Sequence, residues 1–237
     1  MAKFTASKTL IAVMIGGGSK LPAIIKVSQK PRSKFSISLI VSHKKNSFGI
    51  KLALENKIPA VYWNLPDYRS RMASGDPKAR GDYMKHLGWF ISQPRYRPKL
   101  LVFAGWDLVM DGNFFNFFKV DFSSGFAAIN LHPALMPFKN EKGQIILPDG
   151  KRTPVIKGEQ EQVLKTVLAK KLTYFGPSVH FMVPTKYDTG QVIKRAFIKV
   201  GKKETVESLR KKLMPVEDKI LIESINEVIL KYLTVNY

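Results

Sequence analysis

Short apolar runs alternate with helical patterns through the first half of the chain, and this alternation limits the possible folds more than any other feature of the sequence. The first run, 10–15, is continuous and is followed at once by glycine, which is typical of a buried strand. Further strands are predicted at 35–41, 60–63, 100–104 and 127–131, and helices at 21–27, 48–56, 78–92 and 113–118. Because strand–helix–strand repeats form parallel units with right-handed connections, we expect an α/β fold: a Rossmann-like, mostly parallel twisted sheet with helices on both faces.

The second half of the chain has a different pattern. The turn sequence at 148–151, Pro-Asp-Gly-Lys, lies between two short apolar runs and predicts a surface hairpin. The other predicted elements are a helix at 159–171, strands at 179–183 and 192–200, and a polar connection at 66–77. Apolar residues recur at helical spacing toward the C-terminus, where a second helix is expected to begin at Pro215. No linker divides the sequence, so we expect one domain over 1–237.

The charge of the chain points to anionic partners. Lys and Arg number 39 and Asp and Glu 18, which gives a formal net charge of +21. The basic residues are scattered and never run five together, so we expect anionic small molecules and not nucleic acid. Cys is absent, which excludes disulfides, thiolate metal sites and a cysteine nucleophile. No apolar run reaches the ~18 residues of a membrane span, and we expect a cytoplasmic protein.

A glycine loop, Gly16-Gly17-Gly18-Ser19-Lys20, connects the first strand to the first helix. Glycines at this place let the backbone approach an anion, and the N-terminus of the helix, with Ser19 as its expected N-cap, supplies free N–H groups. The spacing fits neither the dinucleotide fingerprint nor the P-loop. The loop is therefore either a generic phosphate cradle or a tight turn that binds nothing.

Asn130 and His132 lie where a buried strand is predicted to end. Residues two apart on a strand face the same way, so the amide and the imidazole should point into one crevice. A carboxylate such as Asp188 would orient the imidazole and raise its pKa above ~6.5. These groups can stabilise an oxyanion and move protons without a protein nucleophile, which suits acyl transfer to an amine. The alternative is a hydrogen-bonded Asn and a helix-capping His, and the other histidines, His43, His86 and His180, are expected to be structural.

Several blocks of the sequence resemble the folate-dependent formyltransferase family. Residues 130–137, Asn-Leu-His-Pro-Ala-Leu-Met-Pro, are similar to the signature Asn-x-His-Pro-Ser-Leu-Leu-Pro of that family. Residues 179–181 and 188–193 are similar to its second block, whose aspartate partners the histidine. The segment 15–25 and Ala104-Gly105-Trp106 also resemble family members, in the same order along the chain.

The resemblance implies a reaction and a site. Formyltetrahydrofolate, as co-substrate, would give its formyl group to the amine of glycinamide ribonucleotide in purine synthesis, with no metal. Asn130 and His132 would stabilise the oxyanion, and Asp188 would raise the pKa of His132 and relay the proton of the amine. The resemblance assigns the phosphate to Gly17, Gly18, Ser19 and Lys20, the ribose to the segment Met214, Pro215, Val216 and Glu217, and the folate to Asp107, Leu108, Val109, Met110 and Asn130. An arginine on the folate would be Arg69 or Arg71.

The chain departs from the pattern of the family at several places. The departures are a glycine loop that is one residue shorter and ends in Lys20, Ala134 in place of serine, one extra residue before Asp188, and Asp107-Leu108 in place of Met-Arg. The insertion 138–156, with its hairpin, has no counterpart in the common form and is either a lid or plain surface. We expect a Rossmann-like, phosphate-binding half at 1–104. The folate-binding and catalytic half at 105–237 would include this insertion and the C-terminal helices.

Three other functions remain open at this point. The amine could be methionyl-tRNA or an amino sugar nucleotide, or the chain could be a basic nucleic-acid-binding protein on a degenerate formyltransferase scaffold. The branch that acts on methionyl-tRNA has a C-terminal barrel, whereas helices are expected after residue 200 here. We therefore favour small-molecule substrates for a monomer or homodimer.

Overall fold

The apolar runs of the first half form a parallel sheet. β1 (Thr9–Ile15) pairs with β2 (Phe35–Ser42) on one side and with β4 (Leu100–Ala104) on the other, and β2 pairs with β3 (Ala60–Tyr62). Ile15 is in register with both Ser42 and Ala104, so β1, β2 and β4 finish side by side. The residues that follow these strands therefore gather at one edge of the sheet, which is where open α/β sheets bind ligands.

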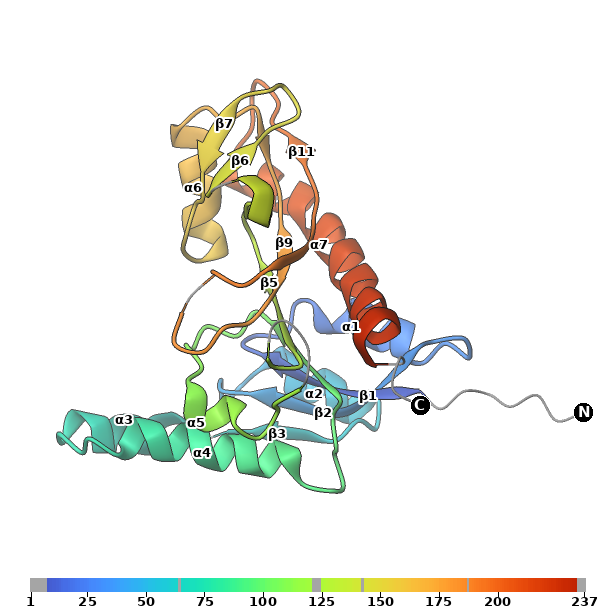
Figure 1. Cartoon of the computed structure of the whole chain (residues 1–237), viewed down its shortest axis with the longest axis vertical. Helices are drawn as coiled ribbons and strands as arrows, with labels where there is room; N and C mark the ends of the chain where they lie inside the picture. Colours follow the sequence, from blue (N-terminus) through green and yellow to red (C-terminus); the bar gives the residue numbers. More distant parts are fainter. Residues whose placement is uncertain (1–7, 64, 121–124, 142, 187, 234–237) are drawn as a thin grey trace, which may run out of the picture. The chain divides into compact units, whose positions relative to one another are not determined.

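Helices cover both faces of these strands. α1 (Leu21–Ser28) and α2 (Phe48–Glu55) lead from β1 through β2 to β3, whereas α3 (Leu65–Ala73) and α4 (Ala79–Ser92) lead back to β4. Right-handed crossovers that run in opposite directions place their helices on opposite faces. Figure 1 shows α1 on one side of the strands and α3 and α4 on the other.

The computed structural model describes residues 8–63, 65–120, 125–141, 143–186 and 188–233. They belong to two compact units, Met1–Ala128 with Asn226–Tyr237, and Ile129–Ile225. The remaining elements are α5 (Gly112–Phe115), β5 (Ala128–His132), η1 (Lys139–Glu141), β6 (Gln144–Ile146), β7 (Arg152–Pro154), α6 (Gln160–Ala169), β8 (Tyr174–Phe175), β9 (Ser178–Phe181), β10 (Val192–Arg195), β11 (Ile198–Lys199), α7 (Val206–Val228) and η2 (Ile229–Leu233). Among the described residues, every helix is too short or too polar to span a bilayer.

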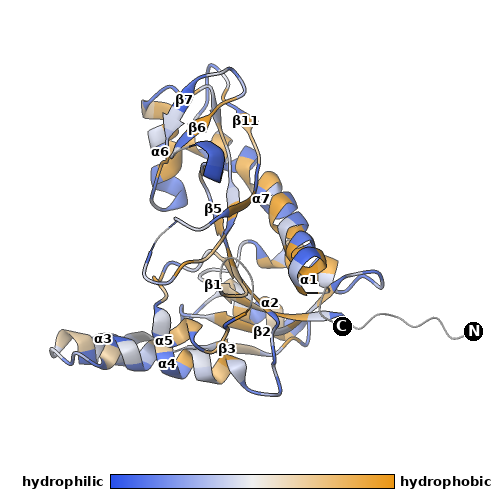
Figure 2. Cartoon of the chain, viewed as in Figure 1, coloured by the Kyte–Doolittle hydropathy of each residue, from blue (hydrophilic) through white to orange (hydrophobic). Residues whose placement is uncertain are grey.

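Antiparallel pairs form the second unit. β9 pairs with β5 on one side and with β10 on the other, and β6–β7 and β8–β11 form two smaller pairs. The strand order is β4-β1-β2-β3 in the first unit and β10-β9-β5 in the second, and the strands with their helices confirm the predicted α/β class. The helices α6 and α7 bury Val163, Leu164, Leu209 and Leu213 in one apolar cluster. Figure 2 shows α7 with alternating orange and blue residues, as expected for an amphipathic helix.

The insertion is anchored in the second unit. Arg195 on β10 makes a two-point ion pair with Glu141, with N–O distances of 2.5 and 2.8 Å. The guanidinium group also lies over the rings of Phe138 and Phe197, at 4.6 and 5.0 Å from their centroids. The hairpin β6–β7 forms as predicted, and Ile145 and Leu147, in and directly after β6, are buried. The start and the hairpin of the insertion are therefore packed and are not plain surface.

Two predictions fail: a connection that forms a helix, and a helix start that lies inside a longer helix. In both, a proline or a polar composition does not by itself mark the boundary of a helix. The segment 66–77, predicted as a connection, forms most of α3, in which Pro66 occupies the tolerated first turn. Arg71 of α3 then pairs with Asp76 and Asp82, at 2.7 and 2.6 Å, and ties α3 to α4. Pro215 does not begin a second helix, since α7 continues through it. Buried Leu209, Leu213 and Ile220 lie on both sides of Pro215, and this packing outweighs the lost hydrogen bond.

Two smaller predictions also fail. Lys20 and not Ser19 is the N-cap of α1, and no side chain caps this helix end. The predicted strand 192–200 is divided into β10 and β11.

Substitution of Gly18 tests how the glycine loop packs. Gly18 has φ +95°, and a Cβ atom there would lie 2.6 Å from Cα of Gly49, at the start of α2. Gly18→Ala should therefore lower the free energy of unfolding by about 1–3 kcal/mol, as measured by urea denaturation. A Cβ atom at Gly17 would meet nothing within 4 Å, so the control Gly17→Ala should change it by less than about 0.5 kcal/mol. Equal stability of the two variants would contradict this packing.

Candidate active site

Asn130 and His132 lie two residues apart on β5 and share a face of the strand. β5 runs antiparallel to β9, and Asn130 is the direct cross-strand partner of His180. The Asn130 side chain is half-buried, while His132 is only 3% exposed. The strand pair therefore fixes the Cα positions of three polar residues in a mostly apolar sheet.

One carboxylate links the two histidines. Oδ2 of Asp188 lies 3.3 Å from Nδ1 of His132, and its Oδ1 lies 3.4 Å from Nε2 of His180. The same Nε2 atom lies 3.2 Å from Nδ2 of Asn130. We name these four residues, Asn130, His132, His180 and Asp188, the Asn–His–Asp cluster. It contains the three predicted catalytic residues and also His180, which the sequence led us to treat as structural.

The hydrogen bonds of His180 orient the amide of Asn130. Nδ1 of His180 lies 2.8 Å from the carbonyl oxygen of Phe181. A carbonyl can only accept, so Nδ1 carries a hydrogen, and the amide nitrogen of Asn130 can only donate, so it directs an N–H toward Nε2. The amide of Asn130 has two N–H donors, and this contact uses one of them. The other is available to a ligand oxygen.

His132 is held at both ring nitrogens. Nδ1 faces Asp188, and Nε2 lies 3.1 Å from the carbonyl oxygen of Ile156, the last residue of the insertion. Both oxygens need an N–H, and a neutral ring supplies only one. Burial nevertheless lowers the pKa of His132 below its usual 6.5, and the charge of Asp188 and the Ile156 contact oppose this only in part. Asp188 therefore acts on the pKa in the expected direction, but burial outweighs it, so the net pKa lies below 6.5 and not above it as predicted.

The Asp188 carboxylate stays ionised despite its burial. Burial raises its pKa, but the polar contact with His180 and the electrostatic influence of His132, His180 and Lys157 outweigh burial and lower the pKa. Asp188 has φ +46°, in the left-handed region that Asp tolerates better than most residues. Gly190 follows, and a Cβ atom there would lie 1.6 Å from the carbonyl oxygen of Phe181. The longer loop thus still returns Asp188 to His132.

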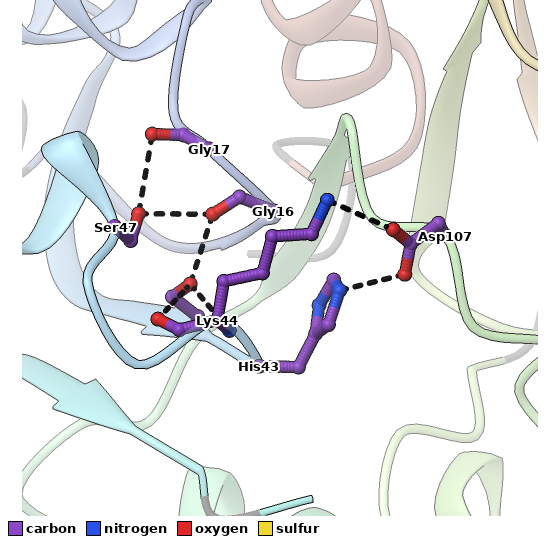
Figure 3. Close-up of polar contacts among 7 residues, drawn as sticks. Gly16, Gly17, His43, Lys44, Ser47 and Asp107 are labelled. Carbon is purple, nitrogen blue, oxygen red and sulfur yellow. Dashed lines mark hydrogen bonds and ion pairs between the residues drawn. The ribbon is translucent and has the colours of Figure 1, made fainter.

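Serine side chains shape the glycine loop in the first unit. The hydroxyl groups of Ser42 and Ser47 donate to the carbonyl oxygen of Gly16, both at 2.9 Å, and Ser47 also contacts that of Gly17 at 3.2 Å (Figure 3). Both carbonyl groups are therefore engaged by hydroxyl donors. Among the other loop residues, Ser19 is exposed, whereas Gly18 and Lys20 are buried.

The segment 107–110, predicted to line the folate pocket, is contacted by three basic residues, His43, Lys44 and Arg80, to which the sequence assigned no partner. Oδ1 of Asp107 lies 2.6 Å from Nε2 of His43. Arg80 on α4 donates to the carbonyl oxygen of Val109 at 2.8 Å. Of the two arginines considered for folate, Arg71 is committed to Asp76 and Asp82 and Arg69 is exposed. The signal for Arg80 was only its place on a predicted helix, which gives no partner.

Glu217, predicted to bind ribose, lies on α7 and is only 2% exposed. The amide nitrogen of Gln160 lies 3.2 and 3.3 Å from its two carboxylate oxygens. Met214 and Pro215 are exposed, and Val216 is half-buried. Across the part of the chain that the structure describes, no group of three or more His, Cys, Asp or Glu residues is placed to hold a metal ion.

Removal of the Asp188 charge tests the electrostatics of the cluster. Because that charge favours the protonated ring, Asp188→Asn should lower the pKa of His132 further below 6.5, as measured by NMR titration of the imidazole. Asp149→Asn, on the hairpin turn beside Lys151 and Thr173, is a matched control and should leave the titration unchanged. Superimposable curves for Asp188→Asn and the unaltered protein would contradict this geometry.

Comparisons with known proteins identify the family of this chain and agree with its fold. The family described as Formyl transferase matches residues 9–225 of this chain. A phosphoribosylglycinamide formyltransferase of Schizosaccharomyces pombe is 24% identical over 93% of this chain and 97% of its own length. The chloroplastic enzyme of that name from Arabidopsis thaliana is 26% identical over 93% of this chain, which spans 65% of that relative. The crystal structure of the phosphoribosylglycinamide formyltransferase of Campylobacter jejuni, 24% identical, shares the fold with a TM-score of 0.72 over 94% of this chain and 99% of that one. The chain therefore belongs to the formyl transferase family.

Proposed function

We propose that this chain transfers the formyl group of formyltetrahydrofolate to the amine of phosphoribosylglycinamide, a step of purine synthesis. The observation that carries the proposal is the meeting of Asn130, His132 and Asp188 in one cluster, within a member of the formyl transferase family. The relatives named for this reaction in fission yeast and Arabidopsis support the choice of amine.

The cluster supplies donors for the oxygen of the formyl group. As the amine attacks, the new N–C bond forms and this oxygen gains negative charge, which the free N–H of Asn130 and the Nε2–H of His132 would stabilise. To reach that oxygen, His132 must exchange the carbonyl of Ile156 for it. When the bond between the formyl carbon and the folate nitrogen breaks, a proton passes from the amine to that nitrogen. Asp188, ionised beside His132, would relay this proton through water.

The glycine loop would hold the phosphate of the ribonucleotide through Gly17, Gly18, Ser19 and Lys20. The hydroxyl contacts to the Gly16 and Gly17 carbonyls support this assignment, because those oxygens would otherwise repel an anion. We assign the ribose hydroxyls to the segment 214–217, where the two oxygens of Glu217 can accept further hydrogen bonds beside Gln160.

The segment 107–110 would receive the pterin of the folate, chiefly through its backbone, with Asn130 at the formyl group. The contact from Arg80 to Val109 supports this role, since it fixes backbone groups that would contact the pterin. We further propose a cytoplasmic monomer or homodimer that needs no metal. The lack of cysteine suits a reducing compartment.

A parallel assay with three acceptors tests the proposal. The unaltered protein should formylate phosphoribosylglycinamide and neither initiator methionyl-tRNA nor an amino sugar nucleotide. Loss of one oxyanion donor costs about 10²–10³-fold in turnover, so Asn130→Ala should lose that much while its fold stays intact. Circular dichroism checks the fold.

Asn140→Ala removes an exposed amide from η1 and should keep normal turnover. Near-normal turnover of Asn130→Ala would remove Asn130 from the mechanism. Transfer to one of the other amines alone would overturn the proposed substrate.

A further inference from the structure

A charged cluster lies at the edge of the first unit where β1, β2 and β4 end. Because Ile15 is in register with Ser42 and Ala104, the residues directly after these strands are neighbours. Asp107 contacts two of the residues at this edge: its Oδ1 lies 2.6 Å from Nε2 of His43, and its Oδ2 lies 3.1 Å from Nζ of Lys44 (Figure 3). Lys44 has no part in the function proposed above, and His43 enters it only through its contact with Asp107.

We propose that Lys44 is a further phosphate-binding residue of the ribonucleotide site, and that His43 and Asp107 are positioning residues that hold its ammonium group beside the glycine loop. This inference rests on the proposed function, which brings a phosphate to that loop.

The Lys44 side chain lies against the first glycine of the loop. A Cβ atom at Gly16 would be 3.3 Å from Cε of Lys44 and 3.4 Å from its Nζ. The side chain is nevertheless 52% exposed, so the ammonium group remains open to solvent and ligand. An ammonium group has three donors, and the contact with Asp107 uses one. The others can bind phosphate oxygens.

Asp107, which orients this ammonium group, is itself held by the buried ring of His43. The His43 side chain is only 4% exposed, and its ring packs edge-on against Trp106 with centroids 4.6 Å apart. Hydrogen bonding from His43, together with its charge and contacts from Lys44, outweighs burial and lowers the pKa of Asp107 to about 2. The ionised carboxylate therefore limits the conformations of Lys44 before a ligand arrives, which saves ordering entropy on binding. One acid with one lysine and one histidine carries no net negative charge, so the cluster does not repel phosphate.

The neighbouring backbone also favours an anion. The carbonyl oxygen of Gly16 accepts from Ser42 and Ser47, and that of Gly17 accepts from Ser47 and the N–H of Gly49. In Figure 3, the ammonium group of Lys44 lies on the side of Gly16 away from Ser47. A phosphate that approaches the ammonium group therefore meets a donor, while the nearest carbonyl groups are engaged elsewhere.

Neighbouring lysines give a matched test. Lys44 and Lys45 are both exposed and carry the same charge, so Lys44→Met and Lys45→Met change the net charge equally. Isothermal titration calorimetry would measure the Kd of the full chain for ribose 5-phosphate and for phosphoribosylglycinamide. Loss of a hydrogen bond to a charged group costs about tenfold or more in affinity, so Lys44→Met should raise the Kd for both ligands by that factor. The Kd values of Lys45→Met should stay within about twofold of those of the unaltered protein, and Lys44→Arg should recover part of the affinity lost in Lys44→Met.

Steady-state kinetics should show the same division. Lys44→Met should raise the KM for phosphoribosylglycinamide while the KM for formyltetrahydrofolate and kcat change little, because phosphate binding is remote from the reacting atoms. Asp107→Asn should raise the Kd for ribose 5-phosphate less than Lys44→Met does. If Asp107 acts through Lys44, adding Asp107→Asn to Lys44→Met should not raise this Kd further. An equal effect of Asp107→Asn in both backgrounds would overturn its positioning role.

The two proposals fail in different ways. If Lys44→Met binds ribose 5-phosphate as tightly as the unaltered protein, the role of Lys44 is wrong and formyl transfer still stands. If ribose 5-phosphate binds through Lys44 but phosphoribosylglycinamide is not formylated, the proposed reaction is wrong and the phosphate site stands.

Discussion

The antiparallel pairing of β5 with β9 is the constraint on which the candidate active site depends. It places Asn130 directly opposite His180, and it keeps His132 on the same face two residues later. A register slip of one residue would turn these side chains to the other face of the sheet. Through His180 the pairing also sets the amide of Asn130, and the loop between β9 and β10 returns Asp188 to His132. The chemistry of the cluster is thus a consequence of strand register.

Much of the fold follows from local patterns in the sequence. β1 and β4 are apolar runs followed by glycine, β2 is an apolar strand with two serines inside it, and each one forms where its pattern predicts it. Asn130 and His132 share a face because they are two residues apart on a strand, which needs no knowledge of the rest of the chain. The hairpin of the insertion forms around its Pro-Asp-Gly turn for the same local reason.

What the sequence could not predict depends on partners far apart along the chain. His43 and Asp107 are 64 residues apart, and Arg80 on α4 donates to the carbonyl oxygen of Val109, which lies between β4 and α5, so no local pattern marks either contact. The pKa of His132 depends on the balance between burial and the Asp188 charge, and the depth of burial is a property of the folded structure. Pro215 stays inside α7 because tertiary packing overrides a strong local preference.

The most direct measurement is a crystal structure of this protein with phosphoribosylglycinamide and a folate analogue whose formyl oxygen is present but cannot be transferred. We expect that oxygen within hydrogen-bond distance of Nδ2 of Asn130 and Nε2 of His132, with the carbonyl of Ile156 displaced from His132. A complex in which both ligands bind and neither contacts Asn130 or His132 would contradict the account.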